Sequence, residues 1–411
     1  MTIVTQRKFI VPYSPVGTTY GDAELKALVS CLTGSETLSC GRQRDLFEAE
    51  FAAYIGVRHA ISVANCTVAL EMAAYLCDLK PGDEVIATAQ SYQATVTPLL
   101  TSPATVRFCD VDPLTLNIDP AAIERLITER TRAIFLVHYG GDMADIAAIR
   151  ALADSRGIII IEDCAHAVGA SRDRVRPGAI GGIGCFSFQS YKNISTLGEG
   201  GMLTTDSDEW AYRLRRLRSI EPDAEYAPRI TNRLGPYQVP DDGVFRHEKE
   251  AFTDDCLVVR HPGTNSTLAE PAAAVGRVQL GRIEELVARR AAIAAALDDA
   301  LRDLPGVIIQ PRPTNATSAH HLYTVFIEDA ARVDQLTLMG RLVEEGIEIQ
   351  QRYFPLHLLS EWRRLGNDLG LCPVTEHTWF HRQLNLPIYP QMTDFQLSFM
   401  IDALVRNLSP R

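Results

Sequence analysis

Strand-like and helix-like segments alternate along this chain from residue 60 onward, and this alternation constrains the fold more than any other feature of the sequence. Apolar runs such as AISVAN, DEVIATA and GIIIIED are separated by segments with helical spacing, among them 67–79 and 93–102. This βαβα order is typical of an α/β domain with a mostly parallel sheet. The run IIII before Glu162 is apolar throughout, as in a strand that helices cover on both faces. We therefore expect functional residues at the carboxyl ends of these strands.

The stretch 219–262 interrupts this alternation. It is rich in prolines, acidic residues and aromatic residues, and it is too long for an ordinary connection between elements. We interpret it as a functional or interface loop. Long helical segments follow it, and strands and helices then alternate again to the end of the chain. We predict a large domain over residues 1–280, which includes this loop, and a smaller C-terminal α/β domain over residues 281–411.

Composition and charge argue against several classes of function. The net charge is -11 and no basic run offsets it, so we expect no nucleic acid partner. The arginine cluster at 213–219 has the spacing of a solvated helix face. No apolar stretch is long enough to span a bilayer and the N-terminus resembles no cleavable leader, so we expect a cytoplasmic protein without membrane contact. The nine cysteines are scattered with no C-x-x-C pair, which predicts reduced core residues.

Lysine is rare in this chain, and Lys192 lies among aromatic, hydroxyl and glycine residues in FSFQSYKNISTLGEGG. The chain has five lysines among its 40 lysine and arginine residues, so it uses arginine where only a positive charge is needed. An amine can lose its proton and act as a nucleophile, whereas a guanidinium cannot. The alternative is a lysine that extends to solvent from the end of a buried strand. This stretch alone leaves both interpretations open.

The turn at residues 65–67 follows a predicted strand and begins a predicted helix. Backbone N–H groups and the positive end of the helix dipole make such a turn suitable for a phosphate, and Thr67 adds a hydroxyl donor. The alternative is that Asn65 only caps the helix. Taken alone, capping is the simpler explanation.

The apolar strand GIIIIED ends in Glu162 and Asp163, and His166 follows three residues after Asp163. A carboxylate at the mouth of a buried strand needs a partner, which a protonated ring nitrogen of a cofactor would supply. The alternatives are a capping aspartate and a histidine satisfied within the core. Zinc has little support because no third ligand stands at a recognisable spacing, and we predict no metal site.

Several common cofactor and catalytic motifs are missing from the sequence. No G-x-G-x-x-G follows a strand, and no G-x-x-x-x-G-K-[ST] occurs, which disfavours a nicotinamide or nucleotide triphosphate enzyme. No G-x-S-x-G is present, which disfavours an α/β hydrolase.

The remaining features fit one cofactor, pyridoxal 5'-phosphate. Its phosphate needs a cup of donors, its ring a stacking partner, its pyridine nitrogen a carboxylate and its aldehyde a lysine amine. The turn at 65–67, Tyr92 after the next strand, Asp163 and Lys192 provide these in chain order. One shared site explains the four features better than four unrelated structural roles.

Taken together, the motifs resemble those of the DegT/DnrJ/EryC1/StrS sugar aminotransferase family of fold type I pyridoxal phosphate enzymes. The resemblance extends over nearly the whole chain. The matching segments are LFEAEFAAYIGVRHAISVANCTVAL, PGDEVIATAQSYQAT, FCDVDPLTLNIDP, VHYGGDMADI, IIIIEDCAHAVGA, CFSFQSYKNISTLGEGG, GTNSTLAEPAAAVGRVQL, YFPLH and LNLPIYPQMT.

The resemblance implies roles for the residues that would contact the cofactor ring. Lys192 would bind the cofactor aldehyde as a Schiff base and act as the catalytic acid and base. Asp163 would pair with the pyridine nitrogen, and His166 would lie near the phenolic oxygen of the ring. Tyr92 would stack on the ring.

The resemblance also implies how the phosphate would be held. Ser187 and Thr67, with the turn at Cys66, would hold the phosphate, and Asn265 would reach it from the partner subunit of a homodimer with a shared active site. The family often has glycine where this chain has Cys66, and the segment 219–262 is longer than the common pattern.

By the same resemblance, we expect an aminotransferase that moves an amino group from glutamate or glutamine to a keto-sugar or keto-cyclitol, in amino sugar, aminocyclitol or antibiotic biosynthesis. An alternative acceptor is a nucleotide-linked keto-sugar used for surface polysaccharide or deoxysugar synthesis. A sister branch that removes a hydroxyl from nucleotide sugars has histidine in place of the lysine, so Lys192 argues against it. A non-catalytic pyridoxal phosphate-binding regulatory protein is a further alternative, which the complete set of cofactor residues disfavours.

The sequence indicates the acceptor site only weakly. Arg352, His357 and His320 could contact a sugar and could equally be structural. The segment 219–262 offers further polar side chains, which are Tyr226, Arg229, Asn232, Tyr237, Asp241 and Arg246.

Overall fold

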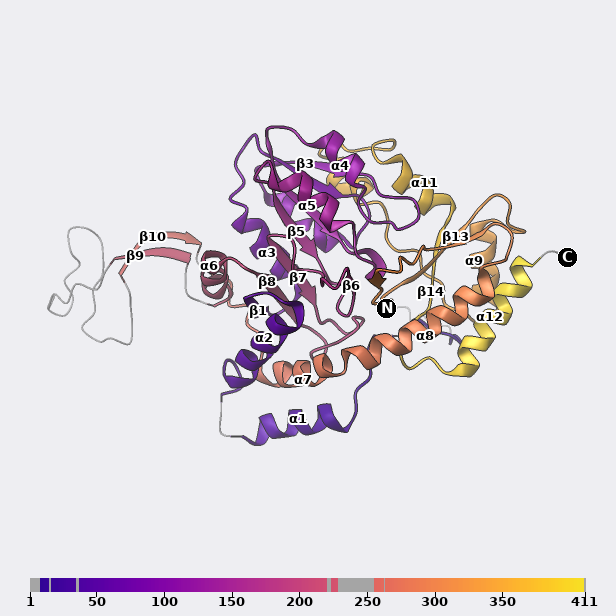
Figure 1. Cartoon of the computed structure of the whole chain (residues 1–411), viewed down its shortest axis with the longest axis horizontal. Helices are drawn as coiled ribbons and strands as arrows, with labels where there is room; N and C mark the ends of the chain where they lie inside the picture. The colour runs from indigo at the N-terminus through magenta and orange to yellow at the C-terminus, as the bar shows by residue number, and fades with distance from the viewer. Residues whose placement is uncertain are drawn as a thin grey trace, which may run out of the picture.

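The computed structural model confirms the predicted α/β class (Figure 1). It describes residues 8–14, 16–34, 37–219, 223–227, 255–261 and 263–409. Within these residues, a seven-stranded sheet has the order β1-β8-β7-β5-β4-β2-β3. Its strands are β1 (His59–Val63), β2 (Glu84–Thr88), β3 (Thr105–Cys109), β4 (Thr131–Val137), β5 (Ile159–Asp163), β7 (Ile183–Ser187) and β8 (Gly201–Thr205). The strands from β3 to β7 pair in parallel, and β8 is antiparallel to both β1 and β7.

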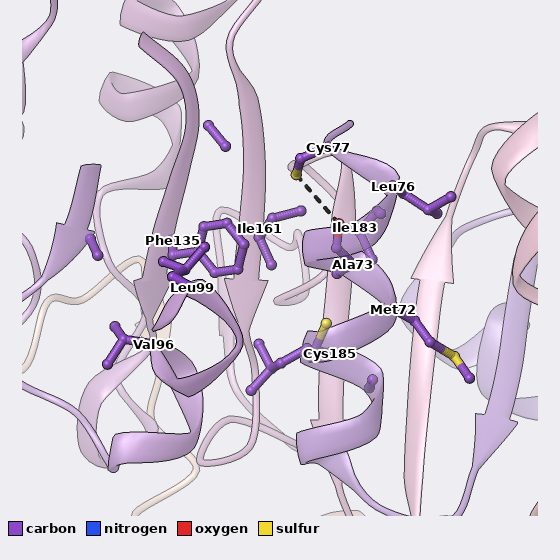
Figure 2. Close-up of a cluster of buried hydrophobic side chains, with 14 of the residues drawn as sticks. Met72, Ala73, Leu76, Cys77, Val96, Leu99, Phe135, Ile161, Ile183 and Cys185 are labelled. Atoms are coloured by element: carbon purple, nitrogen blue, oxygen red, sulfur yellow. Dashed lines mark hydrogen bonds between the residues drawn. The ribbon is translucent and has the colours of Figure 1, made fainter. Parts of the chain in front are cut away.

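Helices cover both faces of this sheet, as the apolar strands predict. Figure 2 shows Ala73 of α3 near Ile183, with Phe135 and Ile161 on neighbouring strands of the same core. The next residues along the strands, such as Ile134, face the opposite core under α4 and α5, because successive side chains of a strand alternate. These helices are α3 (Cys66–Leu76), α4 (Pro120–Leu126), α5 (Ile146–Asp154) and α6 (Asp208–Arg218).

The continuous helix predicted over 93–102 is wrong. Two short 3-10 turns, η1 (Gln93–Thr95) and η2 (Thr97–Thr101), take its place. Pro98 has no backbone N–H and disfavours helical backbone at the residue before it, so an α-helix cannot continue through this stretch. The break leaves Thr95 fully buried beside the end of β5, where it contacts Asp163.

A second core lies toward the C-terminus, around an antiparallel three-stranded sheet of order β11-β13-β14. The strands are β11 (Val307–Ile309), β13 (Tyr323–Ile327) and β14 (Gln383–Leu386), and the helices around them are α8 (Ile283–Leu301), α9 (Gln335–Glu344) and α12 (Asp394–Leu408). The predicted boundary at residue 280 precedes α8, and as a division into domains it stays a prediction. Two segments cross it, because Val11 belongs to the C-terminal core and Trp362 to the core of the large sheet.

The N-terminal helices α1 (Asp22–Thr33) and α2 (Arg42–Ile55) pack against α7 (Glu270–Gly281). The buried carboxylate of Glu270 accepts hydrogen bonds from the backbone N–H groups of Gly41, Gln43 and Arg44, which begin α2. A negative charge at this position also stabilises the helix dipole.

The remaining elements are short or lie apart from the two cores. In Figure 1, the antiparallel pair β9 (Asp223–Ala227) and β10 (Asp255–His261) projects from the body beside α6. The rest of the predicted loop 219–262 lies almost entirely outside the described residues. The other short elements are β6 (Ser171–Arg172), β12 (Ala316–Thr317), η3 (Tyr139–Gly141), η4 (Leu356–Leu358), α10 (Ser360–Arg363) and α11 (Pro373–His381). In the described part of the chain, no helix is both long and apolar enough to cross a membrane.

Arg290 of α8 connects three distant segments. It is 1% exposed, and its guanidinium donates to the backbone carbonyls of Gly17, His320 and Ile388 at 2.6, 2.9 and 3.0 Å. These bonds join the N-terminal segment to the C-terminal core.

We expect Arg290→Met to lower the free energy of unfolding by about 3 kcal/mol or more, because three buried carbonyl groups lose their donors. Urea denaturation would measure the change. The matched control is Arg302→Met at the end of the same helix, where an exposed pair with Asp299 should contribute less than about 1 kcal/mol. Equal effects of the two substitutions would contradict the role assigned to Arg290.

Candidate active site

A cavity of about 620 Å³ opens at the carboxyl ends of β1, β5 and β7. These ends meet at one edge of the sheet because the three strands run in the same direction. All but one of the predicted site residues line the cavity, and they are Cys66, Thr67, Tyr92, Asp163, His166, Ser187 and Lys192. The exception is Asn265.

Lys192 lies on the loop after β7 and lines the cavity. Burial lowers the pKa of Lys192 to about 8, although the charge of Asp163 acts in the opposite direction. The N-terminal segment supports this loop, since Gly17 N–H donates to Ser190 O at 2.7 Å. A Cβ at Gly17 would collide with the backbone carbonyl of Tyr191, so the approach requires glycine. The fold therefore places a readily deprotonated amine in the cavity.

Asp163 ends β5 and is 4% exposed. Its Oδ2 accepts a hydrogen bond from Thr95 Oγ1 at 2.6 Å, and its Oδ1 accepts one from Ala165 N–H at 3.0 Å. Burial raises the pKa of Asp163, against the lowering effects of these bonds and of Lys192. In the described part of the chain, no cationic side chain forms an ion pair with it. A cationic group of a ligand would stabilise its charged form.

Glu162 points away from the cavity, because adjacent residues of a strand face opposite sides. Its carboxylate accepts bonds from His138 Nε2 at 2.9 Å and from the N–H groups of Gly178 and Gly181 at 2.9 and 2.6 Å. Burial alone would raise the pKa of Glu162, but these bonds lower it. His138 Nδ1 accepts from Ala144 N–H, so both of its ring nitrogens are used. His138 and Glu162, which lie close to the Cys164 thiol, therefore already have hydrogen-bond partners within the fold.

His166 belongs to a stack of rings on the cavity wall. Its ring lies 4.4 Å from that of His321 and 5.7 Å from that of Tyr353, at 23° and 11°. Its Nε2 lies 3.3 Å from the Tyr353 hydroxyl, whereas its buried Nδ1 has no partner in the described residues. Burial lowers the pKa of His166 well below its ordinary value, so the imidazole is neutral. A neutral ring with one unused nitrogen can bond a polar atom of a ligand.

The opposite end of the cavity has the features of a phosphate site. α3 begins at Cys66 after an extended Asn65, whose Oδ1 accepts from Val68 N–H at 3.0 Å. The N–H groups of Cys66 and Thr67 precede the first intrahelical bond and are available to an anion. Burial, with a contribution from Asp163, raises the pKa of the Cys66 thiol well above its ordinary value. The thiol is therefore neutral, and Ser187 adds a hydroxyl on the same wall.

These observations fit pyridoxal 5'-phosphate. Four features lie around one cavity. They are the Lys192 amine with its lowered pKa, the buried Asp163 carboxylate without a cationic partner, the unpartnered His166 nitrogen and the N-terminus of α3. Tyr92, whose ring is 52% exposed, also lines it and contacts the edge of Tyr353 at 5.8 Å. The residues present therefore suit the four groups of this cofactor that need a partner, which are its aldehyde, its ring nitrogen, its phenolic oxygen and its phosphate.

Asn265 is exposed, and its backbone has φ 50° in the left-handed region. Its N–H donates to Ser219 O at 3.3 Å, and it is not among the residues that line the cavity of its own chain.

Of the weak acceptor candidates, only Arg352 lines the cavity. His357 bonds Glu376 at 2.8 Å and is fully buried. His320 lies against Arg312, and burial lowers its pKa to about 3. The polar side chains proposed within 219–262 lie outside the described residues or on strands whose side chains are not described.

Sequence reasoning missed several residues in or beside the cavity. Thr95, which bonds Asp163, lies within the segment 93–102 predicted as a helix, and it does not itself line the cavity. His321 stacks on His166 from outside the lining, and Tyr353 lines the cavity; both come from the C-terminal region, and no local pattern links them to His166. Gln189 and Glu199 also line the cavity.

Comparisons with known proteins agree with this geometry. A model of the DegT/DnrJ/EryC1/StrS aminotransferase family matches residues 19–405. The spore coat polysaccharide biosynthesis protein SpsC of Bacillus subtilis (strain 168) is 33% identical over 405 residues, with 98% of each chain covered. The aminotransferase TlmJ from Streptoalloteichus hindustanus has a TM-score of 0.82 and 30% identity, over 96% of this chain and 98% of that chain. DesV of S. venezuelae has a TM-score of 0.79 and 31% identity, over 93% of each chain. The structural matches confirm the predicted fold type I class.

We expect the Lys192 amine to lose its proton near pH 8 in protein freed of cofactor, because its pKa is about 8. Competitive acetylation over about pH 6–11, read by peptide mass spectrometry, would give the midpoint of its reactivity. Asp163→Asn should move this midpoint to lower pH, since the charge of Asp163 raises the pKa of Lys192. The exposed Lys80 in the same digest serves as the internal reference. A Lys192 midpoint above about pH 10 would contradict the lowered pKa.

Proposed function

This chain belongs to the DegT/DnrJ/EryC1/StrS aminotransferase family, and from that premise we propose that it transfers an amino group from glutamate or glutamine to a keto-sugar or keto-cyclitol. The protein is a pyridoxal phosphate-dependent aminotransferase. The observation that carries the proposal is the meeting of Lys192 and Asp163 in one cavity beside the N-terminus of α3.

The cofactor, when bound, supplies an aldehyde that carries the amino group and a ring that accepts electrons from the reacting carbon. Lys192 would hold it covalently at rest, and Asp163 would pair with its ring nitrogen. His166 would donate or accept a hydrogen bond at its phenolic oxygen, and Tyr92 would cover its ring. Ser187 and the N–H groups of Cys66 and Thr67 would hold its phosphate.

The chain's own groups account for the proton transfers. Near neutral pH, a Lys192 amine with a pKa of about 8 exists in both forms. Its neutral form can remove the proton from the α-carbon of the donor, and its charged form can return a proton during transfer to the acceptor. Asp163, held by Thr95 and Ala165, keeps its carboxylate in place for a cation. The rings of His166 and Tyr353 line the cavity, and His321 stacks on His166.

The sugar or cyclitol class of acceptor is supported by the resemblance and by SpsC, a protein named for polysaccharide biosynthesis. That name also favours a second candidate, a nucleotide-linked keto-sugar used for surface polysaccharide. A purely regulatory pyridoxal phosphate-binding protein would use the same lysine and aspartate to hold the cofactor, and the match to an aminotransferase family favours an enzyme over it.

We also propose a homodimer with a shared active site. α1 exposes Leu25, Val29 and Leu32 along one face, at 60, 48 and 55% exposure. A hollow of about 1080 Å³ lies between α1, α2 and α7. A second copy of the chain would cover these apolar side chains and bring its Asn265 to the phosphate.

We expect the wild-type protein to absorb in the visible range and to change its spectrum with glutamate or glutamine. Lys192→Ala should abolish turnover, because no other lysine lines the cavity. The control is Lys80→Ala on the surface. Protein that has reacted with the donor would then be offered keto-cyclitols, free and phosphorylated keto-sugars, nucleotide-linked keto-sugars and simple keto acids. Turnover with keto acids alone would refute the sugar proposal, and normal activity of Lys192→Ala would refute the site.

We expect Asn265→Ala to weaken cofactor retention by about tenfold while the protein stays dimeric, because one donor to the phosphate is lost. Equilibrium dialysis and sedimentation would measure the two properties. Ser266→Ala, one residue along the same segment, is the control. A fully active monomer at micromolar concentration would contradict the shared site.

A further inference from the structure

Arg352 lines the cavity without an anionic partner in the described part of the chain. Its Nε donates to the side-chain oxygen of Gln350, and no described carboxylate pairs with its guanidinium. The Arg352 side chain is half-buried, and an anionic partner would stabilise a partly desolvated guanidinium. The cavity therefore contains a cation that neither Asp163 nor any other described acid neutralises.

The C-terminal sheet fixes the backbone of Arg352. Its N–H donates to Asn385 Oδ1 at 2.8 Å, and its carbonyl accepts from the hydroxyl of Tyr139 and the side chain of Gln383. Asn385 is itself held by Thr324 Oγ1 at 3.0 Å. The segment that carries Arg352 is thus joined to β14 through Asn385 and through the bridge between Gln350 and Asn385.

Two tyrosines fix the side chain. The guanidinium carbon lies 5.4 Å from the ring centroid of Tyr13 and 5.8 Å from that of Tyr353. Tyr13 is held by a bond from its hydroxyl to Leu386 O at 3.1 Å, and the Tyr353 hydroxyl lies 3.3 Å from His166. A planar guanidinium placed between two rings is oriented for a planar anion such as a carboxylate.

We propose that Arg352 binds the α-carboxylate of the amino donor, and so selects an amino acid for the first half of the reaction. This inference rests on the proposed function. The α-carboxylate is attached to the carbon that Lys192 must deprotonate, so its partner must lie near the Lys192 amine. The charge of Arg352 does act on Lys192, as one of the effects that lower the pKa of the amine.

A phosphate of the acceptor is the competing anion for Arg352. The phosphates of a nucleotide-linked sugar are separated from the reacting carbon by the sugar ring, whereas Arg352 lines the same cavity as Lys192 and His166. The cofactor phosphate has its own site at the start of α3. The donor carboxylate is therefore the anion that best matches the position of Arg352.

A binding experiment tests this without turnover. Glutarate has two carboxylates but no amine or keto group, and calorimetry on the holoenzyme would measure its affinity. We expect Arg352→Met to weaken glutarate binding by about 10- to 100-fold, and Arg352→Lys to restore part of it, since charged hydrogen bonds are lost. Arg364→Met, at an exposed arginine that does not line the cavity, is the control. Unchanged glutarate affinity in Arg352→Met would overturn the proposal.

The donor half-reaction identifies which carboxylate is bound. The α-carboxylate is the only carboxylate that glutamate and glutamine have in common, so Arg352→Met should raise the apparent Kd of both to a similar extent, read from the cofactor spectrum. If Arg352→Met weakens the binding of glutamate and not that of glutamine, Arg352 binds the side-chain carboxylate, and the proposal is overturned. Binding of inorganic pyrophosphate that Arg352→Met abolishes, with donor affinity unchanged, would assign it to the acceptor and also overturn it.

The two failures can be told apart. If neither donor changes the spectrum of the wild-type protein, the proposed function fails, and the glutarate titration still reports whether Arg352 binds a carboxylate. If the wild type reacts with both donors and Arg352→Met reacts with the same apparent Kd, only the inference about Arg352 fails.

Discussion

The burial of a lysine and an aspartate in one cavity is the constraint on which the rest of the site depends. Burial lowers the pKa of Lys192 and raises that of Asp163, so each group is shifted toward its neutral form. Their mutual attraction opposes both shifts but does not remove them. The hydrogen bonds that Asp163 accepts from Thr95 and Ala165 offset part of the free-energy cost of burying its charge. A ligand with an aldehyde and a cationic ring nitrogen would use both groups.

Two sheets build the cavity from opposite sides. The parallel strands deliver Asp163 and Ser187 from their carboxyl ends, where chain direction alone brings side chains together. The C-terminal region contributes Arg352 and Tyr353, from a segment joined to β14, and His321 just before β13 stacks on His166. Arg290 stabilises the junction through three carbonyl groups, so packing between the two cores positions the reactive residues.

Local sequence rules selected residues that line one cavity where a single element determines the position of the residue. The turn at 65–67 begins a helix because Asn65 caps it, and Asp163 faces the cavity because it ends a buried strand. The rules failed at 93–102, where Pro98 breaks the helix and the resulting turns bury Thr95 against Asp163. Periodicity alone had no means of separating Glu162 from Asp163, since their opposite orientations require knowledge of which face holds the cavity.

The sequence by itself determined the α/β class, the family resemblance and the candidate cofactor residues at the strand ends of the large sheet, because alternation, strand ends and motif wording are local properties. Only the tertiary structure brought Arg352, Tyr353 and His321 to His166 and Lys192, across more than a hundred residues of chain. It also separated His357 and His320 from the cavity. Contacts between distant segments arise from the packing of complete elements, and no local pattern of residues encodes which side chains will meet.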